Sequence, residues 1–175
     1  MPSIFQHVLG QFPHVGIVID NPKLCARYAA ALIKGVTIGP SPGWMQRRHG
    51  LKVDPAWVSA TPGIVSGLGL ILQAVSAPGD EVVLFPPVYH AFRRIILANE
   101  RRILDVQLIQ DNGRYVMDFD AMRNRLTPKT KVVFFCSPHN PGGTVWTPKE
   151  IRALALFCAE HDLLLVSDEI HCDLV

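Results

Sequence analysis

The sequence predicts an α/β fold, with helices on both faces of a mostly parallel sheet. From about residue 58 onward, short apolar or β-branched runs alternate with stretches of helical pattern, which is typical of strand–helix–strand units. Two of the runs, residues 132–136 (VVFFC) and 163–166 (LLLV), are apolar almost without alternation. A strand has this pattern when both faces of its sheet are covered, as in a parallel sheet.

The composition of the 175 residues sets limits on this fold. Hydrophobic residues make up 49% of the chain and charged residues 18%, below the roughly 25% of an ordinary soluble domain. Global disorder is therefore excluded, and the length suits one domain or part of a larger one. The longest apolar run, residues 153–159, is far shorter than the roughly 18 residues that a membrane-spanning helix needs.

Four segments are expected to be strands and four to be helices. The expected strands are residues 81–85, 102–108, 131–136 and 163–167. The expected helices are residues 62–77, 89–99, 118–126 and 148–161. The last helix has a clear start signal, because Thr147 is a good N-cap, Pro148 suits the first helical position and Glu150 suits the first turn.

The first 43 residues carry weaker signals. Residues 23–34 are rich in Ala and Leu and predict a helix, whereas residues 35–43 (GVTIGPSPG) have the composition of a loop. No basic segment followed by an apolar one opens the chain, so no signal peptide is expected. The four cysteines form no C-x-x-C pair, which favours a reduced, cytoplasmic context. A net charge of +2 without blocks of like charge predicts neither a nucleic acid nor a membrane partner.

Four loops are each expected to follow a strand, the first of them a further strand that runs into residue 59, so they are expected to meet at one edge of the sheet. The first, residues 59–65, runs into a helix through Gly63. Its backbone N–H groups suit an anion, although an ordinary helix capped by Thr61 fits the same residues. The second, residues 85–89, has two prolines that present Tyr89 for stacking on a flat ring, or as a rim residue over the core.

The other two loops carry polar residues. Residues 137–143 (SPHNPGG) are constrained by prolines, and Asn140 offers a fixed amide to an oxygen anion; a turn kept for its geometry is the plainer alternative. Residues 167–171 (SDEIH) place Asp168 at the end of a buried strand. A charge there needs a metal or a protonated ring nitrogen, unless the acid caps a following turn. Spacings such as C-x-x-H at residues 136–139 match no zinc pattern, so no metal site is expected.

In this order and at these spacings, the four motifs resemble those of fold-type I pyridoxal-phosphate enzymes. They are TPGIV (61–65), PPVY (86–89), SPHNPGG (137–143) and SDEIH (167–171). The sequence is most similar to the cystathionine β-lyase or C–S lyase branch of the class I/II aminotransferase family. The segments RHG (48–50), Y-x-M-D (115–118) and VWT (145–147) also match, so the resemblance covers about residues 44–175.

The resemblance implies a bound pyridoxal 5′-phosphate (PLP) and assigns residues to it. The implied cofactor-binding residues are Gly63, Ile64, Val65, Tyr89, Asn140, Asp168 and His171. The backbone of the first three would hold the phosphate, Tyr89 would stack on the pyridine ring, and Asn140 would bond the ring's 3-oxygen. Asp168 would keep the ring nitrogen protonated, so that the ring can accept electrons. His171 stands where many aminotransferases have a tyrosine, which favours the lyase branch.

The resemblance also implies residues that are not recognised in this chain. The family's Schiff-base lysine and its substrate-binding arginine are expected beyond residue 171, and the family's N-terminal features are not recognisable in residues 1–43. We therefore expect residues 1–43 to be a poorly matched N-terminal segment. Residues 44–175 are expected to be an incomplete PLP-binding large domain. No catalytic residue is assigned within the chain, which is expected to be inactive alone.

The function that the resemblance implies is β-elimination at an L-cysteine conjugate such as cystathionine, giving a thiol, pyruvate and ammonia. A PLP-dependent aminotransferase is the alternative within the family. A non-catalytic remnant or cofactor-binding module is the alternative outside enzymes. The implied partners are a small amino-acid substrate and, for the intact protein, a second copy in a homodimer.

Overall fold

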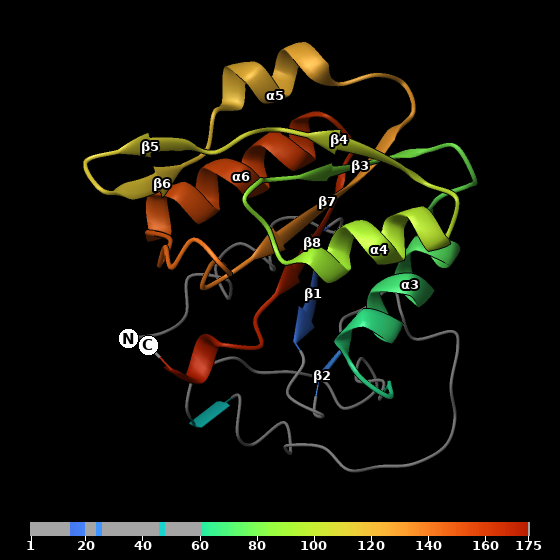
Figure 1. Cartoon of the computed structure of the whole chain (residues 1–175), viewed down its shortest axis with the longest axis horizontal. Coiled ribbons are helices and arrows are strands. Elements are labelled where there is room, and N and C mark those ends of the chain that lie inside the picture. The colour runs from blue at the N-terminus through green and yellow to red at the C-terminus, as the bar shows by residue number, and fades with distance from the viewer. Residues whose placement is uncertain (1–14, 20–23, 26–45, 48–60, 175) are drawn as a thin grey trace.

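The fold is known from a computed structural model, which describes residues 15–19, 24–25, 46–47 and 61–174. A six-stranded sheet forms its centre (Figure 1), in the order β2-β1-β8-β7-β3-β4. Strand β2 is antiparallel to β1, and all the other neighbours in the sheet are parallel. The strands are β1 (Val15–Ile19), β2 (Leu24–Cys25), β3 (Glu81–Leu84), β4 (Arg102–Asp105), β7 (Thr130–Cys136) and β8 (Leu164–Asp168).

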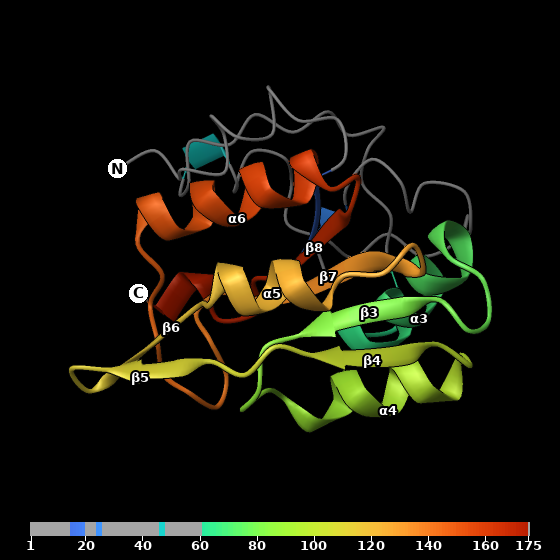
Figure 2. The same ribbon diagram turned by 90° about the horizontal axis from the view of Figure 1, so that it is seen from above.

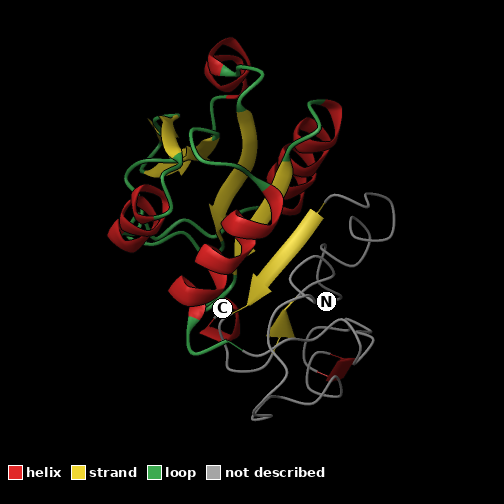
Figure 3. Ribbon diagram, turned by 90° about the vertical axis from the view of Figure 1, so that its right-hand side faces the viewer, coloured by secondary structure: helices red, strands yellow, loops and turns green. Residues whose placement is uncertain are grey.

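Helices cover both faces of this sheet (Figures 2 and 3). The helices are α3 (Ile64–Val75), α4 (His90–Ala98), α5 (Phe119–Arg125), α6 (Pro148–Glu160) and the short 3₁₀ helix η2 (Cys172–Leu174). Successive side chains of a strand point to opposite faces, so Val133 packs with α5 and α6 whereas Val132 packs with α3 and α4. The predicted α/β architecture, with strands covered on both faces, is confirmed.

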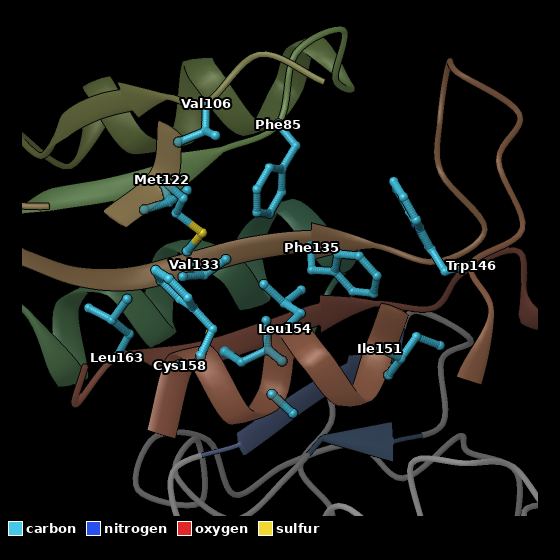
Figure 4. Close-up of a cluster of buried hydrophobic side chains, with 14 of the residues drawn as sticks. Phe85, Val106, Met122, Val133, Phe135, Trp146, Ile151, Leu154, Cys158 and Leu163 are labelled. Carbon is cyan, nitrogen blue, oxygen red and sulfur yellow. The ribbon is translucent and has the colours of Figure 1, made fainter. Parts of the chain in front are cut away.

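The cluster between the sheet and helix α6 contains the indole of Trp146 and several phenylalanine rings (Figure 4). Phe85 and Phe135 are almost completely buried there. Burial of each ring contributes roughly 1.5–3 kcal/mol to folding. Trp146 packs against Phe135 with ring centroids 5.6 Å apart, and its indole Nε1 donates to the carbonyl of Cys136 at 2.9 Å. Because that hydrogen bond satisfies the only polar atom of the indole, Trp146 can be buried beside the end of β7 at little cost.

The start of α6 matches its sequence signal. Glu150 N donates to the Thr147 hydroxyl oxygen, and Thr147 N donates in return to the Glu150 carboxylate at 2.7 Å. This reciprocal pair is a capping box, and Pro148 occupies the first turn, where its missing N–H costs nothing. The predicted start of this helix is confirmed.

The start of α3 differs from the expectation. Gly63, with φ +126°, is the N-cap, and as a glycine it offers the helix no capping side chain. Thr61 is therefore not the cap; its hydroxyl instead donates to the Gly63 carbonyl at 3.0 Å. The hydroxyl thus fixes the loop before the helix rather than an N–H group of the first turn.

A two-stranded hairpin, β5 (Ile109–Asp111) and β6 (Arg114–Val116), was not expected. Asn112 and Gly113 form its turn with positive φ values of 49° and 81°, a conformation that Asn-Gly adopts readily. The predicted strand over residues 102–108 accordingly ends at Asp105. The Asn-Gly pair is the sequence signal that could have predicted this hairpin.

The N-terminal part of the sheet corrects another expectation. The helix predicted over residues 23–34 is wrong at its start, where Leu24–Cys25 forms strand β2; residues 26–34 lie outside the described residues. Strand β1 was not predicted, and its register is fixed by pairing with β8, where Val18 lies opposite Asp168. In the part of the chain that the structure describes, no helix is long and apolar enough to cross a membrane.

Candidate functional site

Three polar loops leave the sheet at the same edge, because β3, β7 and β8 are parallel and end there. Cys136 and Asp168 lie opposite each other as the last residues of β7 and β8. The pairing continues by one bond, in which Ser137 N donates to the Asp168 carbonyl at 2.9 Å. The loop that carries Asn140 and the acid that ends β8 are therefore neighbours.

The N-terminus of α3 reaches the same edge. Its first residue, Ile64, belongs to the buried cluster that includes Cys136 and Val166, and Val65 and Tyr89 pack against that cluster. The N–H groups of a first helical turn point outward along the axis and favour an anion, and the N-cap Gly63 has no side chain of its own to bond them. Among the described residues, a Cβ atom added at Gly63 would meet nothing within 4 Å, so the position of that missing side chain is open.

Tyr89 is the N-cap of α4 and stands two residues after Pro87, the second of the two prolines that follow β3. Its half-buried ring contacts His90 and Phe92 edge to face, with centroids 4.9 and 5.8 Å away. The proline segment is held by Leu108 N, which donates to the Pro86 carbonyl at 2.9 Å. The backbone before the tyrosine is thus fixed from the side of β4.

The Asn140 loop is closed by its own backbone. His139 N donates to the Thr144 carbonyl at 2.9 Å, and Gly143 N donates to the His139 carbonyl at 2.7 Å. The Thr144 hydroxyl, which is buried, accepts from Tyr115 N of the hairpin at 3.2 Å. Asn140 is half-buried at the tip of a loop that is held from within and from the side.

Asp168 is a buried acid, with 3% of its surface exposed. Its Oδ1 accepts from Ile170 N at 3.1 Å, so the turn-capping alternative of the sequence analysis describes a real contact. His171 is half-buried in the turn before η2, and its carbonyl accepts from Leu174 N at 3.0 Å. The structure therefore brings Asp168 and the Asn140 loop together, whereas the described hydrogen bonds of His171 are those of its backbone.

The acid beside Asp168 is unusual. Burial raises the pKa of Glu169 to about 7; the Ser167 hydroxyl, which donates to its carboxylate at 2.7 Å, opposes this rise, and the nearby Asp168 adds to it. Near neutral pH, Glu169 is therefore only partly ionised. Less negative charge then accumulates beside Asp168 than two neighbouring acids would suggest.

Cys136 is not poised as a nucleophile. Burial raises the pKa of its thiol to about 12, with a further contribution from Asp168. The thiol stays protonated and donates to the Pro138 carbonyl, with sulfur and oxygen 3.2 Å apart. Its role in this structure is to fix the first turn of the Asn140 loop.

The sequence analysis missed the function of His139, which it weighed only as a metal ligand. In the structure its Nε2 lies 2.8 Å from the Pro87 carbonyl, so it joins the Asn140 loop to the Tyr89 loop. Among the described residues, no group of three or more His, Cys, Asp and Glu side chains is arranged to hold a metal ion. No sequence spacing could have indicated this contact, because the two residues are 52 positions apart.

Comparison with known proteins gives the family context. Residues 41–175 match the model of the family "Aminotransferase class I and II". The cystathionine β-lyase PatB of Bacillus subtilis is 42% identical over 134 residues, which cover 76% of this chain and 35% of that protein. The aspartate/prephenate aminotransferase of Thermus thermophilus is 34% identical over 126 residues, which cover 72% and 32%. The chain therefore spans about a third of the length of these curated relatives.

A solved structure agrees with this result. The PLP-bound C–S lyase from Staphylococcus hominis superposes with a TM-score of 0.73 at 30% identity, over 81% of this chain and 38% of that one. The expected resemblance to fold-type I PLP enzymes, which include both lyases and aminotransferases, is confirmed. The chain belongs to the aminotransferase class I and II family of PLP-dependent enzymes.

Proposed function

We propose that this chain binds PLP at the carboxyl edge of its sheet, as part of a C–S β-lyase. The lyase would cleave an L-cysteine conjugate such as cystathionine to a thiol, pyruvate and ammonia. One observation carries the proposal: the buried carboxylate of Asp168 ends β8 beside the loop of Asn140, joined to it through Ser137 N. This places a buried charge beside an amide on a closed loop, as a flat, charged heteroaromatic ligand requires.

The start of α3 suits the cofactor's phosphate. The backbone N–H groups around Gly63, Ile64 and Val65 lie at the N-terminus of α3, and a helix N-terminus attracts a dianion through both hydrogen bonds and the helix dipole. Gly63 has φ +126° and leaves open space where a side chain would stand. Another residue there would strain the backbone and narrow the approach to the phosphate.

The three remaining roles concern the cofactor's ring. Tyr89 would stack on it, and the Asn140 amide would donate to its 3-oxygen. Asp168 would accept from the protonated ring nitrogen, and its burial strengthens that attraction. When bound, the cofactor supplies an electron-accepting ring for chemistry at the carbon next to the substrate's amino group. The residues present fit this cofactor.

The choice of lyase over aminotransferase rests on finer evidence. The lyase relative is 42% identical to this chain and the aminotransferase relative 34%, over similar lengths. His171, half-buried three residues after Asp168, is assigned to the side of the 3-oxygen, where the resemblance favours the lyase branch. An aminotransferase is the second candidate, supported by the Thermus relative. With either reaction we expect a cytoplasmic homodimer of the intact protein.

The test has a binding arm and a product arm. For binding, the 175-residue chain is titrated with pyridoxine 5′-phosphate, which has the ring and phosphate but no aldehyde to react with lysines. Asp168→Asn is expected to weaken binding about tenfold or more, because a charge-assisted hydrogen bond is lost. Asp120→Asn, the same change at an exposed position, should leave the affinity unchanged. Equal affinities for both variants and the parent chain would contradict the proposed site.

For products, the protein isolated from the organism that makes it is incubated with L-cystathionine and no keto acid. Release of pyruvate and ammonia is the expected result. Release of product only after a keto acid is added would replace the lyase with the aminotransferase while leaving the cofactor site intact. No turnover under either condition would contradict both enzymatic functions.

A further inference from the structure

A buried histidine joins two arms of the candidate site. His139, with 3% of its surface exposed, immediately precedes Asn140, and its Nε2 lies 2.8 Å from the carbonyl of Pro87. Pro87 is two residues before Tyr89. This hydrogen bond therefore links the backbone just before Tyr89 to the backbone just before Asn140.

The chemistry of this contact fixes the form of the imidazole. A carbonyl oxygen can only accept, so Nε2 must carry the proton and donate it. Burial lowers the pKa of His139, and the carbonyls of Pro87 and Cys136 oppose that effect less strongly. The ring is therefore the neutral Nε2–H tautomer, and its Nδ1 has no hydrogen-bond partner among the residues that the structure describes. The bond to Pro87 gives this buried polar side chain a hydrogen-bond partner.

The imidazole has little room to move. The indole of Trp146 packs against it edge to face at 5.6 Å, and that indole is itself anchored on the Cys136 carbonyl. A Cβ atom at Gly142 would lie only 2.8 Å from His139 Cδ2, so the loop also closes over the ring. A displacement of the ring would therefore move Asn140 and Pro87 together.

We propose that His139 is a positioning residue of the cofactor site, which sets the stacking plane of Tyr89 relative to the in-plane amide of Asn140. The inference rests on the proposed PLP site. A flat ring is held well only if the amide at its edge lies in the plane of the ring and the stacking residue lies at contact distance above that plane. The phosphate end is independent of this bond, since it depends on the start of α3. Loss of the bond should therefore weaken binding of the ring and spare binding of phosphate.

The test uses two neutral amide variants that differ by one methylene. In His139→Gln the side-chain amide can take the place of ring Nε2 and donate to the Pro87 carbonyl, whereas in His139→Asn it is too short to reach. We expect the Gln variant to bind pyridoxine 5′-phosphate within about threefold of the parent chain and the Asn variant to bind about tenfold more weakly. All three chains should bind inorganic phosphate equally. A ¹⁵N NMR spectrum of the parent chain should also show the Nε2–H tautomer.

Each other outcome has a defined meaning. Equal ring affinity in the Gln and Asn variants, or a parallel loss of phosphate affinity in the Asn variant, overturns the positioning role while the PLP site itself stands. A parent chain that shows the Nδ1–H tautomer also overturns it. A parent chain that binds phosphate but not pyridoxine 5′-phosphate overturns the proposed function and, with it, this inference.

Discussion

Gly142 shows how strictly the Asn140 loop is packed. A Cβ atom at this residue would lie 2.8 Å from His139 Cδ2 and 2.8 Å from Tyr115 Cδ2, closer than real Cβ contacts. Gly143, by contrast, has φ +68° and open space where a Cβ atom would stand. The first glycine is needed for room between two rings, and the second for its backbone conformation.

Gly142→Ala is therefore expected to destabilise the chain by about 1–3 kcal/mol, because an added methyl in a packed site pushes both rings away. Gly143→Ala should cost about 1 kcal/mol through backbone strain alone. Urea denaturation of the two variants measures both effects. Adding Tyr115→Leu should recover part of the loss in the first variant and none in the second, because only Gly142 faces that ring. A Gly142→Ala chain as stable as the parent would refute the crowding.

Individual residues differ in how far the sequence predicts them. Tyr89 and Asn140 follow strand ends and Asp168 is the last residue of β8. A local pattern therefore places them at one edge of the sheet, and their proposed roles stay predictions. The bond of His139 to Pro87 depends on two segments that meet only after β3 and β7 have paired. The sequence pattern within either segment alone does not predict this contact.

At the scale of elements, the hairpin β5–β6 supports the site from outside the sheet. Arg114 of β6 binds Glu150 of α6, with Nη1 and Oε1 2.6 Å apart, and the same carboxylate accepts from Thr147 N. Tyr115 N donates to Thr144 in the stretch between the Asn140 loop and the helix. Helix α6 was predictable because its capping box is local. The hairpin was missed because its three-residue strands are largely exposed or half-buried and show no apolar pattern.

The shared carboxylate of Glu150 gives this junction a defined pH dependence. The Arg114 hydrogen bond lowers the pKa of Glu150 to about 2, against the opposing effect of burial and with further help from Thr147. Because the folded-state pKa lies below the ordinary 4.5, the contribution is present above about pH 4.5 and is lost as the pH falls toward 2.

Glu150→Gln should therefore lower the free energy of unfolding by about 0.5–1 kcal/mol at neutral pH, the range for a partly exposed pair. Glutamine retains the capping-box acceptor, so the loss isolates the charge. The difference in the free energy of unfolding between variant and parent chain should become smaller near pH 3. Urea denaturation at neutral pH and at pH 3 measures this difference. Glu160→Gln, at an exposed position of the same helix, serves as the control. If this difference in the free energy of unfolding stays constant with pH, the effect comes from packing and not from the charge of Glu150.

At the scale of the whole molecule, the layered architecture follows from the apolar strands. Val132 and Val133 face opposite clusters, so β7 must be covered on both sides, and the run VVFFC predicts this directly. The position of β1 beside β8 was not predictable in the same way. Strand order is set by pairing between segments about 150 residues apart, and the pattern of either strand alone fits any inner position.

The stability of the whole chain should also report the unusual acid beside Asp168. Burial raises the pKa of Glu169 to about 7, above the ordinary 4.5, so the folded state holds this proton more tightly than the unfolded state does. Its favourable contribution is therefore complete below about pH 4.5 and is lost as the pH rises through 7. His139 acts in the opposite direction, because its lowered pKa makes protonation below about pH 6.5 favour unfolding.

Glu169→Gln separates the two groups, since it retains an acceptor for the Ser167 hydroxyl but cannot ionise. Relative to the parent chain, this variant should gain about 1–2 kcal/mol of stability between about pH 5 and pH 8, a figure kept below the full shift because the side chain is half-buried. Urea denaturation across that range measures the gain, and Glu160→Gln again provides the exposed control. A difference between variant and parent that does not change with pH would mean that Glu169 is ionised throughout. Two neighbouring carboxylates would then stand at the end of β8, and Asp168 would no longer dominate the charge offered to a ligand.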